Sequence, residues 1–261
     1  MNSCEPAGVP ASVLITGASG GIGGALAAVY AEAGRTLVLQ GRNELRLAEL
    51  AAFCEARGAR VLTQVLDLRD RVALADWLRK LCAQEQLDLV IVNAGLNTHV
   101  GPSGAAEGWP EVQDLLEVNV VAAWATVNAV LPAMRLRGQG QIALISSLAA
   151  FYGLPVAPSY CASKAAIKVY GEAMRGWLAA EGIRINVVMP GYVESSMCRA
   201  MPGPKPFLWS AERAARYIRR GLERNRARIS FPFPLNLGTW FLSVLPPTVS
   251  ERILRLLNYG G

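Results

Sequence analysis

The chain is most informative at a glycine-rich stretch, Thr16-Gly17-Ala18-Ser19-Gly20-Gly21-Ile22-Gly23. An apolar run, Val13–Thr16, precedes this stretch and a helical pattern, Ala25–Ala33, follows it, so the chain is predicted to turn here from a strand into a helix. Glycines let a backbone approach a ligand closely, and the unpaired amide groups at a helix start favour negative charge. The stretch therefore predicts a site for the pyrophosphate of a dinucleotide, with a plain turn as the alternative.

Short apolar runs and helix-length segments alternate along the whole chain. The runs are predicted to be strands, and they cover Val13–Thr16, Leu37–Gln40, Val61–Leu66, Leu89–Asn93, Ile142–Ser146, Ile183–Met189 and Ile229–Phe231. Because they are apolar on both faces, they suit a parallel sheet with helices on each side. We expect an α/β fold of one domain, a doubly wound Rossmann fold with a seven-stranded parallel sheet flanked by helices. This domain would span residues 1–231, and an apolar helical extension would span residues 232–261.

The composition is that of a protein with a large core. The 261 residues are 52% hydrophobic and 18% charged, which argues against a disordered chain or a fibre. The net charge of +6 suits an anionic partner such as a phosphorylated cofactor. The five cysteines are scattered, so neither a disulfide framework nor a metal site is predicted, and the N-terminus lacks a signal-peptide pattern. We expect a cytoplasmic protein, with association at a membrane surface as an alternative.

The end of the second predicted strand bears on the choice of dinucleotide. It reads Leu39-Gln40-Gly41-Arg42, and it lacks the acid that binds the ribose of NAD in Rossmann folds. The Arg42 guanidinium can pair with a 2′-phosphate, so NADP(H) is predicted over NAD(H), unless Arg42 only begins the next helix in solvent. Asp67 ends the third strand. Its carboxylate either accepts a hydrogen bond from an adenine amino group or caps the helix that starts near Arg69.

Two side chains with paired chemistry follow the fifth strand. Tyr160 and Lys164 are four residues apart in a segment that reads as helical, so they are predicted to lie one turn apart on one face. A nearby ammonium group favours the phenolate and lowers the pKa of a tyrosine from about 10. Ser147 ends the strand, and the connection to Tyr160 is short enough for both hydroxyls to meet one substrate oxygen. A solvated helix pair is the alternative.

Taken together, these motifs resemble those of the short-chain dehydrogenase/reductase family. They occur in the family's order as Thr16–Gly23, Asn93-Ala94-Gly95, Asn119, Ser147, Tyr160–Lys164 and Pro190-Gly191, and the resemblance runs from about Val13 to Phe231. It implies an NADP(H)-dependent oxidoreductase that transfers hydride between nicotinamide and a carbonyl or secondary alcohol of an apolar substrate. A catalytically silent NADP-binding regulator is the alternative, and nucleic-acid binding is a third possibility that we do not favour.

The resemblance also implies a role for each matching residue. Tyr160 would be the general acid or base, and Ser147 would orient the substrate carbonyl. Lys164 would bind the nicotinamide ribose, and Asn119 would hold a water that links Lys164 to solvent. The implied cofactor-binding set is Gly17, Ser19, Gly21, Ile22, Gly23, Arg42, Asp67, Leu68, Asn93, Ala94, Gly95, Tyr160, Lys164, Pro190, Gly191, Val193 and Ser195. Within this set Asn93 would brace the sheet, and Ser195 would hold the nicotinamide amide.

The remaining features concern partners. In this family the helix that corresponds to Leu115–Met134 commonly packs against another subunit, so a homodimer or homotetramer is expected. The apolar tail, Pro232–Gly261, is expected to pack on the subunit core, to wall the substrate pocket or to rest on a membrane. His99, the only histidine, lies in a predicted loop near the substrate cleft, where an incidental role is the simpler interpretation.

Overall fold

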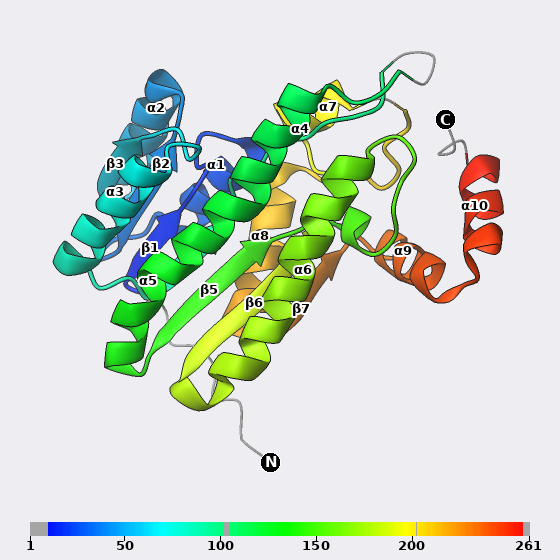
Figure 1. The fold of residues 1–261 in the computed structure, drawn as a ribbon. Helices are drawn as coiled ribbons and strands as arrows, with labels where there is room; N and C mark the ends of the chain where they lie inside the picture. The colour runs from blue at the N-terminus through cyan, green and yellow to red at the C-terminus, as the bar shows by residue number, and fades with distance from the viewer. Residues whose placement is uncertain (1–9, 102–104, 202, 258–261) are drawn as a thin grey trace.

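A parallel sheet runs through the middle of the molecule, in a computed structural model that describes residues 10–101, 105–201 and 203–257 (Figure 1). The seven strands of this part of the chain lie in the order β3-β2-β1-β4-β5-β6-β7, which confirms the predicted doubly wound fold. Their bounds are β1 (Ser12–Ile15), β2 (Thr36–Gly41), β3 (Arg60–Val65), β4 (Leu89–Val92), β5 (Gly140–Ile145), β6 (Ile183–Pro190) and β7 (Arg228–Phe231).

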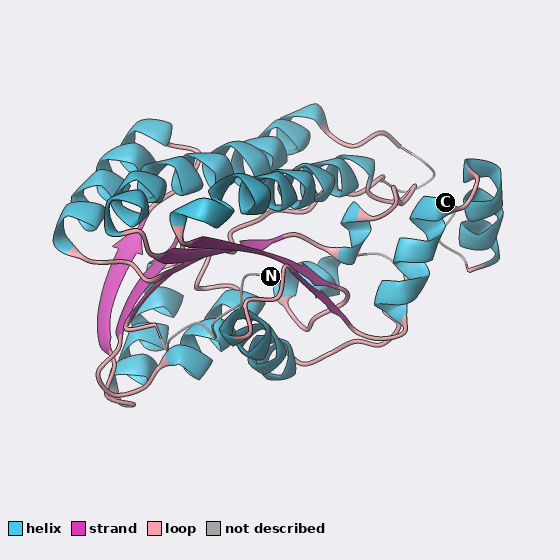
Figure 2. Cartoon of the chain, turned by 90° about the horizontal axis from the view of Figure 1, so that it is seen from below, coloured by secondary structure: helices cyan, strands magenta, loops and turns pink. Residues whose placement is uncertain are grey.

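Helices cover both faces of the sheet (Figure 2). One layer contains α1 (Gly21–Tyr30), α2 (Glu44–Glu55) and α8 (Ala211–Glu223), and the other contains α3 (Arg71–Gln84), α4 (Trp109–Leu116), α5 (Ala123–Arg137) and α6 (Pro158–Leu178). Shorter elements are the π-helical turn η2 (Glu117–Ala122), the 3₁₀ turns η3 (Leu148–Ala150) and η4 (Ala179–Glu181), and α7 (Ser196–Ala200). The chain then continues into α9 (Leu235–Val244) and α10 (Pro247–Leu256).

The core consists of two apolar clusters, one on each face of the sheet. Val13 and Ile15 of β1 belong to the cluster beneath α1 and α8, whereas Leu14 belongs to the cluster beneath α3, α5 and α6. Successive side chains of a strand point to opposite faces, so a strand buried on both sides must be apolar throughout. This is why the predicted strands read as unbroken apolar runs.

The helical stretch Trp109–Arg137 is as long as a membrane span. Trp109–Arg137 comprises α4, η2 and α5, and among the described residues it is the one helix long and apolar enough to cross a bilayer, because its most apolar 18-residue window has a mean hydropathy of 1.4. Half of its most apolar window is buried inside the fold. Val127 and Leu131 of α5 pack into the same cluster as Val90 of β4, so in this structure the stretch is a core helix.

The extension after β7 projects beyond the edge of the sheet, at the right of Figures 1 and 2. Leu235 at its start packs against a small cluster that includes Leu148 and Met189, while the ring of Phe241 is 51% exposed. Helices α9 and α10 account for most of this segment up to residue 257, and residues 258–261 lie outside the described residues. The division into a domain of residues 1–231 and an extension of residues 232–261 stays a prediction.

Helix α6 packs against the sheet through a glycine, Gly171. A Cβ atom at Gly171 would lie 2.6 Å from Val187 Cγ2 of β6 and 2.8 Å from Leu144 Cδ1 of β5. Distances below about 3 Å require the neighbours to move, so a side chain here would push α6 away from β5 and β6. The packing at Gly171 consequently sets the distance between α6 and the ends of those strands.

We predict that Gly171→Ala lowers the free energy of unfolding by about 1–3 kcal/mol, the usual cost of an overpacked core. Gly176→Ala is the matched control, because Gly176 lies in the same helix with no atom near its missing Cβ. Alanine is the better helix former by up to about 1 kcal/mol, so this variant should be slightly stabilised. Urea denaturation of both variants measures the difference, and equal effects at the two positions would contradict the packing argument.

Candidate active site

The glycine-rich turn after β1 is held against the end of β4. Gly17 has φ of +65°, and a Cβ atom there would lie 2.8 Å from Ala94 Cα, so glycine is required on both counts. The Asn93 Nδ2 group donates to the carbonyl oxygens of Thr16 and Gly17 at 3.0 and 3.1 Å. The backbone amides of Asn93 and Ala94 donate to Thr16 Oγ1 at 3.0 and 3.2 Å. Asn93 therefore braces the turn itself.

Gln40 adds a second brace that the sequence analysis did not single out. Its Oε1 accepts a hydrogen bond from the Gly17 amide at 3.0 Å, and its Nε2 donates to the Leu66 carbonyl oxygen at 2.7 Å. The side chain is buried at the end of β2 and so ties the turn after β1 to the end of β3. Its partners lie 23 and 26 residues away, so no local pattern marks it.

The start of α1 has the features of a pyrophosphate site. Its N-cap, Gly20, makes no side-chain hydrogen bond to the helix, so the amide groups of the first turn have no acceptor from a capping side chain. These are the amides of Gly21, Ile22 and Gly23, at the positive end of the helix dipole. A Cβ atom at Gly21 would lie 2.8 Å from the Glu194 carbonyl oxygen, so the loop after β6 also reaches this point. The donors and the small residues fit a dinucleotide.

The end of β2 is shaped by a second close approach. A Cβ atom at Gly41 would lie 2.8 Å from Ser19 Oγ and 3.3 Å from Ser19 Cβ, so the Ser19 hydroxyl stands directly against this position. Arg42 follows, with an exposed side chain whose charge contributes to lowering the pKa of Asp67. Ser19, Gly41 and Arg42 thus meet at the end of β2, beside the end of β3.

Asp67 does not cap the helix that follows it but forms an ion pair with Arg69. Its carboxylate accepts hydrogen bonds from the Arg69 amide at 3.0 Å and from the Arg69 guanidinium, with a shortest distance of 2.7 Å. These bonds hold the pKa of Asp67 below its usual range. The helix cap is Asp70, whose Oδ1 accepts from the Ala73 amide at 2.9 Å, so the interpretation of Asp67 as a cap is wrong. The neighbouring Leu68 is buried in the core.

Ser147, Tyr160 and Lys164 come together beyond the end of β5. Ser147 caps η3 directly after the strand: its Oγ accepts from the Ala149 amide at 3.2 Å and donates to the Pro190 carbonyl oxygen at 3.4 Å. The same hydroxyl lies close enough to Tyr160 to lower the pKa of the phenol. The Lys164 Nζ atom lies 5.7 Å from the centroid of the Tyr160 ring and donates to the Ile145 carbonyl oxygen at 3.1 Å. Both side chains project from the first two turns of α6. The arrangement is that of a proton donor with a hydroxyl on one side and an amine on the other.

Burial shifts the two titrating groups in opposite directions. It raises the pKa of Tyr160 to about 12, and the nearby Ser147 hydroxyl offsets this only in part. It lowers the pKa of Lys164 to about 8. Burial disfavours whichever form carries a charge, which explains the opposite signs. The expectation that Lys164 makes the phenol unusually acidic is therefore wrong for this structure, in which Tyr160 is a protonated phenol at neutral pH.

Asn119 belongs to the π-helical turn η2, which lies near Lys164 of α6. Its Oδ1 accepts from the Leu96 amide at 2.7 Å, and its Nδ2 donates to the Leu96 carbonyl oxygen and to Ser163 Oγ, both at 3.0 Å. A Cβ atom at Gly95 would lie 3.2 Å from Asn119 Oδ1 and 3.3 Å from Lys164 Nζ. A side chain at Gly95 would therefore crowd both the amide oxygen of Asn119 and the amine of Lys164.

The loop after β6 completes the edge of the site. The Gly191 amide donates to the Phe231 carbonyl oxygen at 2.7 Å, and a β-bridge joins Val193 to Trp209. Pro190 is the last residue of β6. Ser195 Oγ accepts from the Cys198 amide at 3.0 Å and so caps α7, which means that its hydroxyl has a structural partner already. Its contact with a nicotinamide amide stays a prediction.

One carboxylate near the site was not among the predicted residues. Glu107 Oε1 accepts from Thr98 Oγ1 at 2.7 Å, and its Oε2 accepts from Ser159 Oγ at 2.5 Å and from the Ser159 amide at 3.1 Å. Ser159 directly precedes Tyr160. No local pattern marks Glu107, because Ser159 is 52 residues away in the sequence. Among the described residues, no group of three or more His, Cys, Asp or Glu side chains could hold a metal ion.

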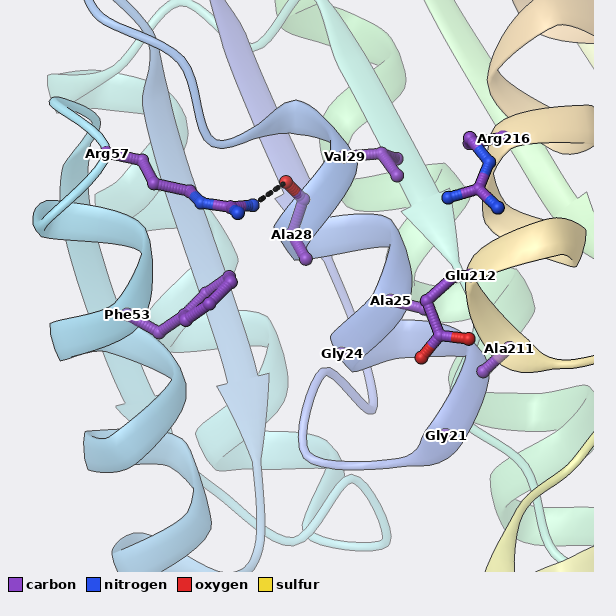
Figure 3. A pocket seen from close by; sticks show the side chains of 10 residues that line it. All are labelled: Gly21, Gly24, Ala25, Ala28, Val29, Phe53, Arg57, Ala211, Glu212 and Arg216. Carbon is purple, nitrogen blue, oxygen red and sulfur yellow. Dashed lines mark hydrogen bonds between the residues drawn. The ribbon is translucent and has the colours of Figure 1, made fainter.

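A groove on the outer side of α1 lies apart from this group (Figure 3). It has a volume of about 410 Å³ and lies between α2 and α8 over the small residues of α1. Arg57 forms one side, where its guanidinium stands 4.3 Å from the Phe53 ring centroid and donates to the Ala28 carbonyl oxygen at 3.5 Å. Gly21 is the one lining residue that belongs to the predicted set, and none of the predicted catalytic residues reaches the groove.

The lowered pKa of Lys164 predicts a pH dependence of stability. Between pH 8 and pH 10.5 the unfolded chain still binds the Lys164 proton while the folded chain has released it, so this group makes the wild type more stable as the pH rises. Relative to Lys164→Met, the wild type should gain about 2–3 kcal/mol from pH 7 to pH 10. Thermal unfolding checks this. Lys168→Met, one turn along α6, is the control, and an equal trend there would contradict the prediction.

Comparison with known proteins identifies a family model and full-length relatives of this chain. A family model described as short chain dehydrogenase matches residues 11–203. An uncharacterized oxidoreductase of Myxococcus xanthus is 35% identical over 249 residues, which cover 95% of this chain and 97% of that protein. An uncharacterized oxidoreductase of Mycobacterium tuberculosis is 33% identical over 248 residues, which cover 92% of this chain and 96% of that protein.

A solved structure shows the same fold over nearly the whole length. A short-chain dehydrogenase from Sphingobium yanoikuyae in complex with NADPH is similar with a TM-score of 0.78 and 24% sequence identity, and the similarity covers 95% of each chain. The family model spans most of this chain, and the two curated relatives match it almost from end to end. The chain therefore belongs to the short-chain dehydrogenase/reductase family and is an oxidoreductase.

Proposed function

We propose that this protein is an NADP(H)-dependent enzyme that interconverts a carbonyl and a secondary alcohol on an apolar substrate. The observation that carries the proposal is the grouping of Ser147, Tyr160 and Lys164 on one edge of a sheet whose first turn fits a pyrophosphate. Ligands of doubly wound sheets bind at this carboxyl edge, where the strand order reverses. Members of the family use NAD(P)(H), which supplies or accepts the hydride when it is bound.

The chain's own residues would handle the proton. A phenol with a pKa of about 12 is protonated at neutral pH, so Tyr160 can donate its proton to a substrate carbonyl oxygen as negative charge develops there. The Ser147 hydroxyl, whose proton points at the Pro190 carbonyl oxygen at 3.4 Å in this structure, would turn to donate its hydrogen bond to the same substrate oxygen. The Lys164 amine, with a pKa of about 8, is mostly charged at pH 7 and would stabilise the phenolate that remains.

The alternative of a catalytically silent regulator is not favoured. Such a protein needs the fold and the dinucleotide site but not a proton donor with its partners. Here Ser147 and Lys164 both lie near Tyr160, with the Lys164 Nζ atom 5.7 Å from the centroid of its ring, and the curated relatives are described as oxidoreductases. The direction of the reaction would follow from the ratio of oxidised to reduced dinucleotide in the cell.

A preference for NADP(H) is supported by the end of β2. Gly41 has no side chain that could bind the ribose hydroxyls of NAD, and Ser19 Oγ lies directly against its position, 2.8 Å from where a Cβ atom would be. Arg42 is exposed beside it and bears a charge that suits a 2′-phosphate. Ser19 Oγ is close enough to Gly41 to offer a further hydrogen bond to the same phosphate.

We also propose a homodimer or homotetramer that forms through the outer faces of α5 and α6. Trp124 of α5 stacks on Tyr170 of α6 at 5.0 Å, and Trp177 of α6 is 59% exposed. In α9, the exposed side chains of Trp240 and Phe241 support a further contact with an apolar substrate entrance or a membrane surface. We expect a cytoplasmic protein, so contact of α9 with a membrane would be limited to the membrane surface.

The proton-donor role predicts the outcome of Tyr160→Phe. This variant keeps the ring but removes the proton, so the oxidation of NADPH by ketones or aldehydes should fall by at least about 100-fold, the lower range for general acid catalysis. Binding of NADPH, followed by the quenching of intrinsic fluorescence, should change little. Absorbance at 340 nm measures the reaction, and full activity of the variant would refute the mechanism.

The cofactor preference predicts a selective effect of Arg42→Ala. Loss of the guanidinium should weaken NADPH binding by about 10-fold or more, the worth of one charge-assisted hydrogen-bond pair, and should leave NADH binding unchanged. Arg46→Ala, an exposed arginine of α2, is the control. Equal losses of affinity for NADPH and NADH in the Arg42 variant would argue against a 2′-phosphate contact.

A further inference from the structure

We propose that Glu107 is a positioning residue that fastens the first turn of α6 and thereby holds the Tyr160 phenol in place for proton transfer. The inference rests on the function proposed above and deepens it. It assigns a task to a carboxylate that lies outside every motif discussed so far, and it follows from how α6 begins.

Helix α6 starts without a cap of its own. Its N-cap residue, Ala157, makes no side-chain hydrogen bond, and Pro158 in the first helical position has no amide hydrogen. The amide of Ser159 is therefore the first donor of this helix, and such donors at a helix start have no partner within the helix. Tyr160 is the next residue. A first turn that frays would carry the phenol with it.

Glu107 supplies the missing cap from a distant part of the chain. Its Oε2 accepts from the Ser159 amide at 3.1 Å and from Ser159 Oγ at 2.5 Å. A carboxylate at this position also carries a negative charge at the positive end of the α6 dipole. This arrangement satisfies the donor that Ala157 leaves open, and it acts on the residue adjacent to Tyr160.

The other carboxylate oxygen ties in the segment after β4. Glu107 Oε1 accepts from Thr98 Oγ1 at 2.7 Å, and Thr98 is buried. The Val100 amide donates to the Val156 carbonyl oxygen at 2.9 Å, so the same two regions are also joined through their backbones. Glu107 therefore fixes α6 to a segment that begins three residues after Gly95, close to Asn119 and Lys164.

The protonation state suits this task. Burial raises the pKa of Glu107, but the hydrogen bonds from Ser159 and Thr98 outweigh it and hold the pKa below its usual range. An ionised carboxylate has only acceptor sites, and the three donors that face Glu107 use them. A glutamine could keep only part of this set, since its amide nitrogen cannot accept a hydrogen bond.

The experiment compares Glu107→Ala, Glu107→Gln and the control Glu111→Ala, an exposed acid in the first turn of α4. For NADPH oxidation by a ketone substrate, Glu107→Ala should lower kcat by about 10- to 100-fold, the effect expected of a displacement of about 1 Å. Glu107→Gln should fall between this variant and the wild type. The Kd of NADPH should stay within about two-fold, because the dinucleotide site does not include Glu107.

Amide hydrogen exchange provides a readout that does not depend on activity. Protection of the Ser159 amide, and of the Cys161 amide that donates to the Ala157 carbonyl oxygen at 3.0 Å, should drop in Glu107→Ala and persist in Glu111→Ala, while Gln40 and the glycine turn keep their protection. A wild-type kcat in Glu107→Ala would overturn the inference. So would a parallel loss of NADPH binding and of protection throughout the fold, because the residue would then serve general stability.

The same data separate this inference from the proposed function. If the wild type oxidised no NADPH with any carbonyl compound, the proposed function would fail. Loss of Ser159 protection in Glu107→Ala would still show that Glu107 holds the first turn of α6 in place. If Tyr160→Phe were inactive and Glu107→Ala fully active, the proposed function would stand and Glu107 would have no positioning role.

Discussion

Parallel pairing is the constraint on which the site depends, because it brings the carboxyl ends of all seven strands to one edge of the sheet. β1 pairs with β4, β4 with β5 and β5 with β6, each in parallel register. The glycine turn, Asn93, Ser147 and Pro190 are far apart in the sequence, yet each ends or follows one of these strands. Helix α6 then adds Tyr160 and Lys164 over the same edge, at a distance that Gly171 permits.

The electrostatics of this edge follow from burial. Tyr160 and Lys164 lie in surroundings that favour the uncharged form of each, so the pKa of the phenol rises and the pKa of the amine falls. A phenol that holds its proton firmly is suited to donate only when a strong acceptor, such as an oxygen gaining negative charge, comes within reach. Lys164 then matters most after the proton has left, when a phenolate must be stabilised.

Long-range side-chain hydrogen bonds hold the backbone of the site in shape. Asn93 at the end of β4 and Gln40 of β2 form hydrogen bonds with the glycine turn, and Glu107 accepts hydrogen bonds from the start of α6. Two of these three residues lie outside the family motifs. A sequence motif identifies residues that contact the ligands. The residues that hold these in position can be identified only from their hydrogen-bond partners in the folded structure.

The sequence by itself determined the sheet, its seven strands and the grouping of the motifs, because apolar periodicity and glycine turns act over a few neighbouring residues. The sequence left open which acid caps α3, since Asp67 and Asp70 are three residues apart and carry the same local signal, and the structure shows that the cap is Asp70. The tertiary structure alone decided the sign of the Tyr160 pKa shift, which depends on how much of the fold covers the phenol. Gln40 likewise bonds to residues 23 and 26 positions away, and Glu107 bonds to Ser159, 52 positions away; hydrogen bonds over such separations exist only once the chain has folded.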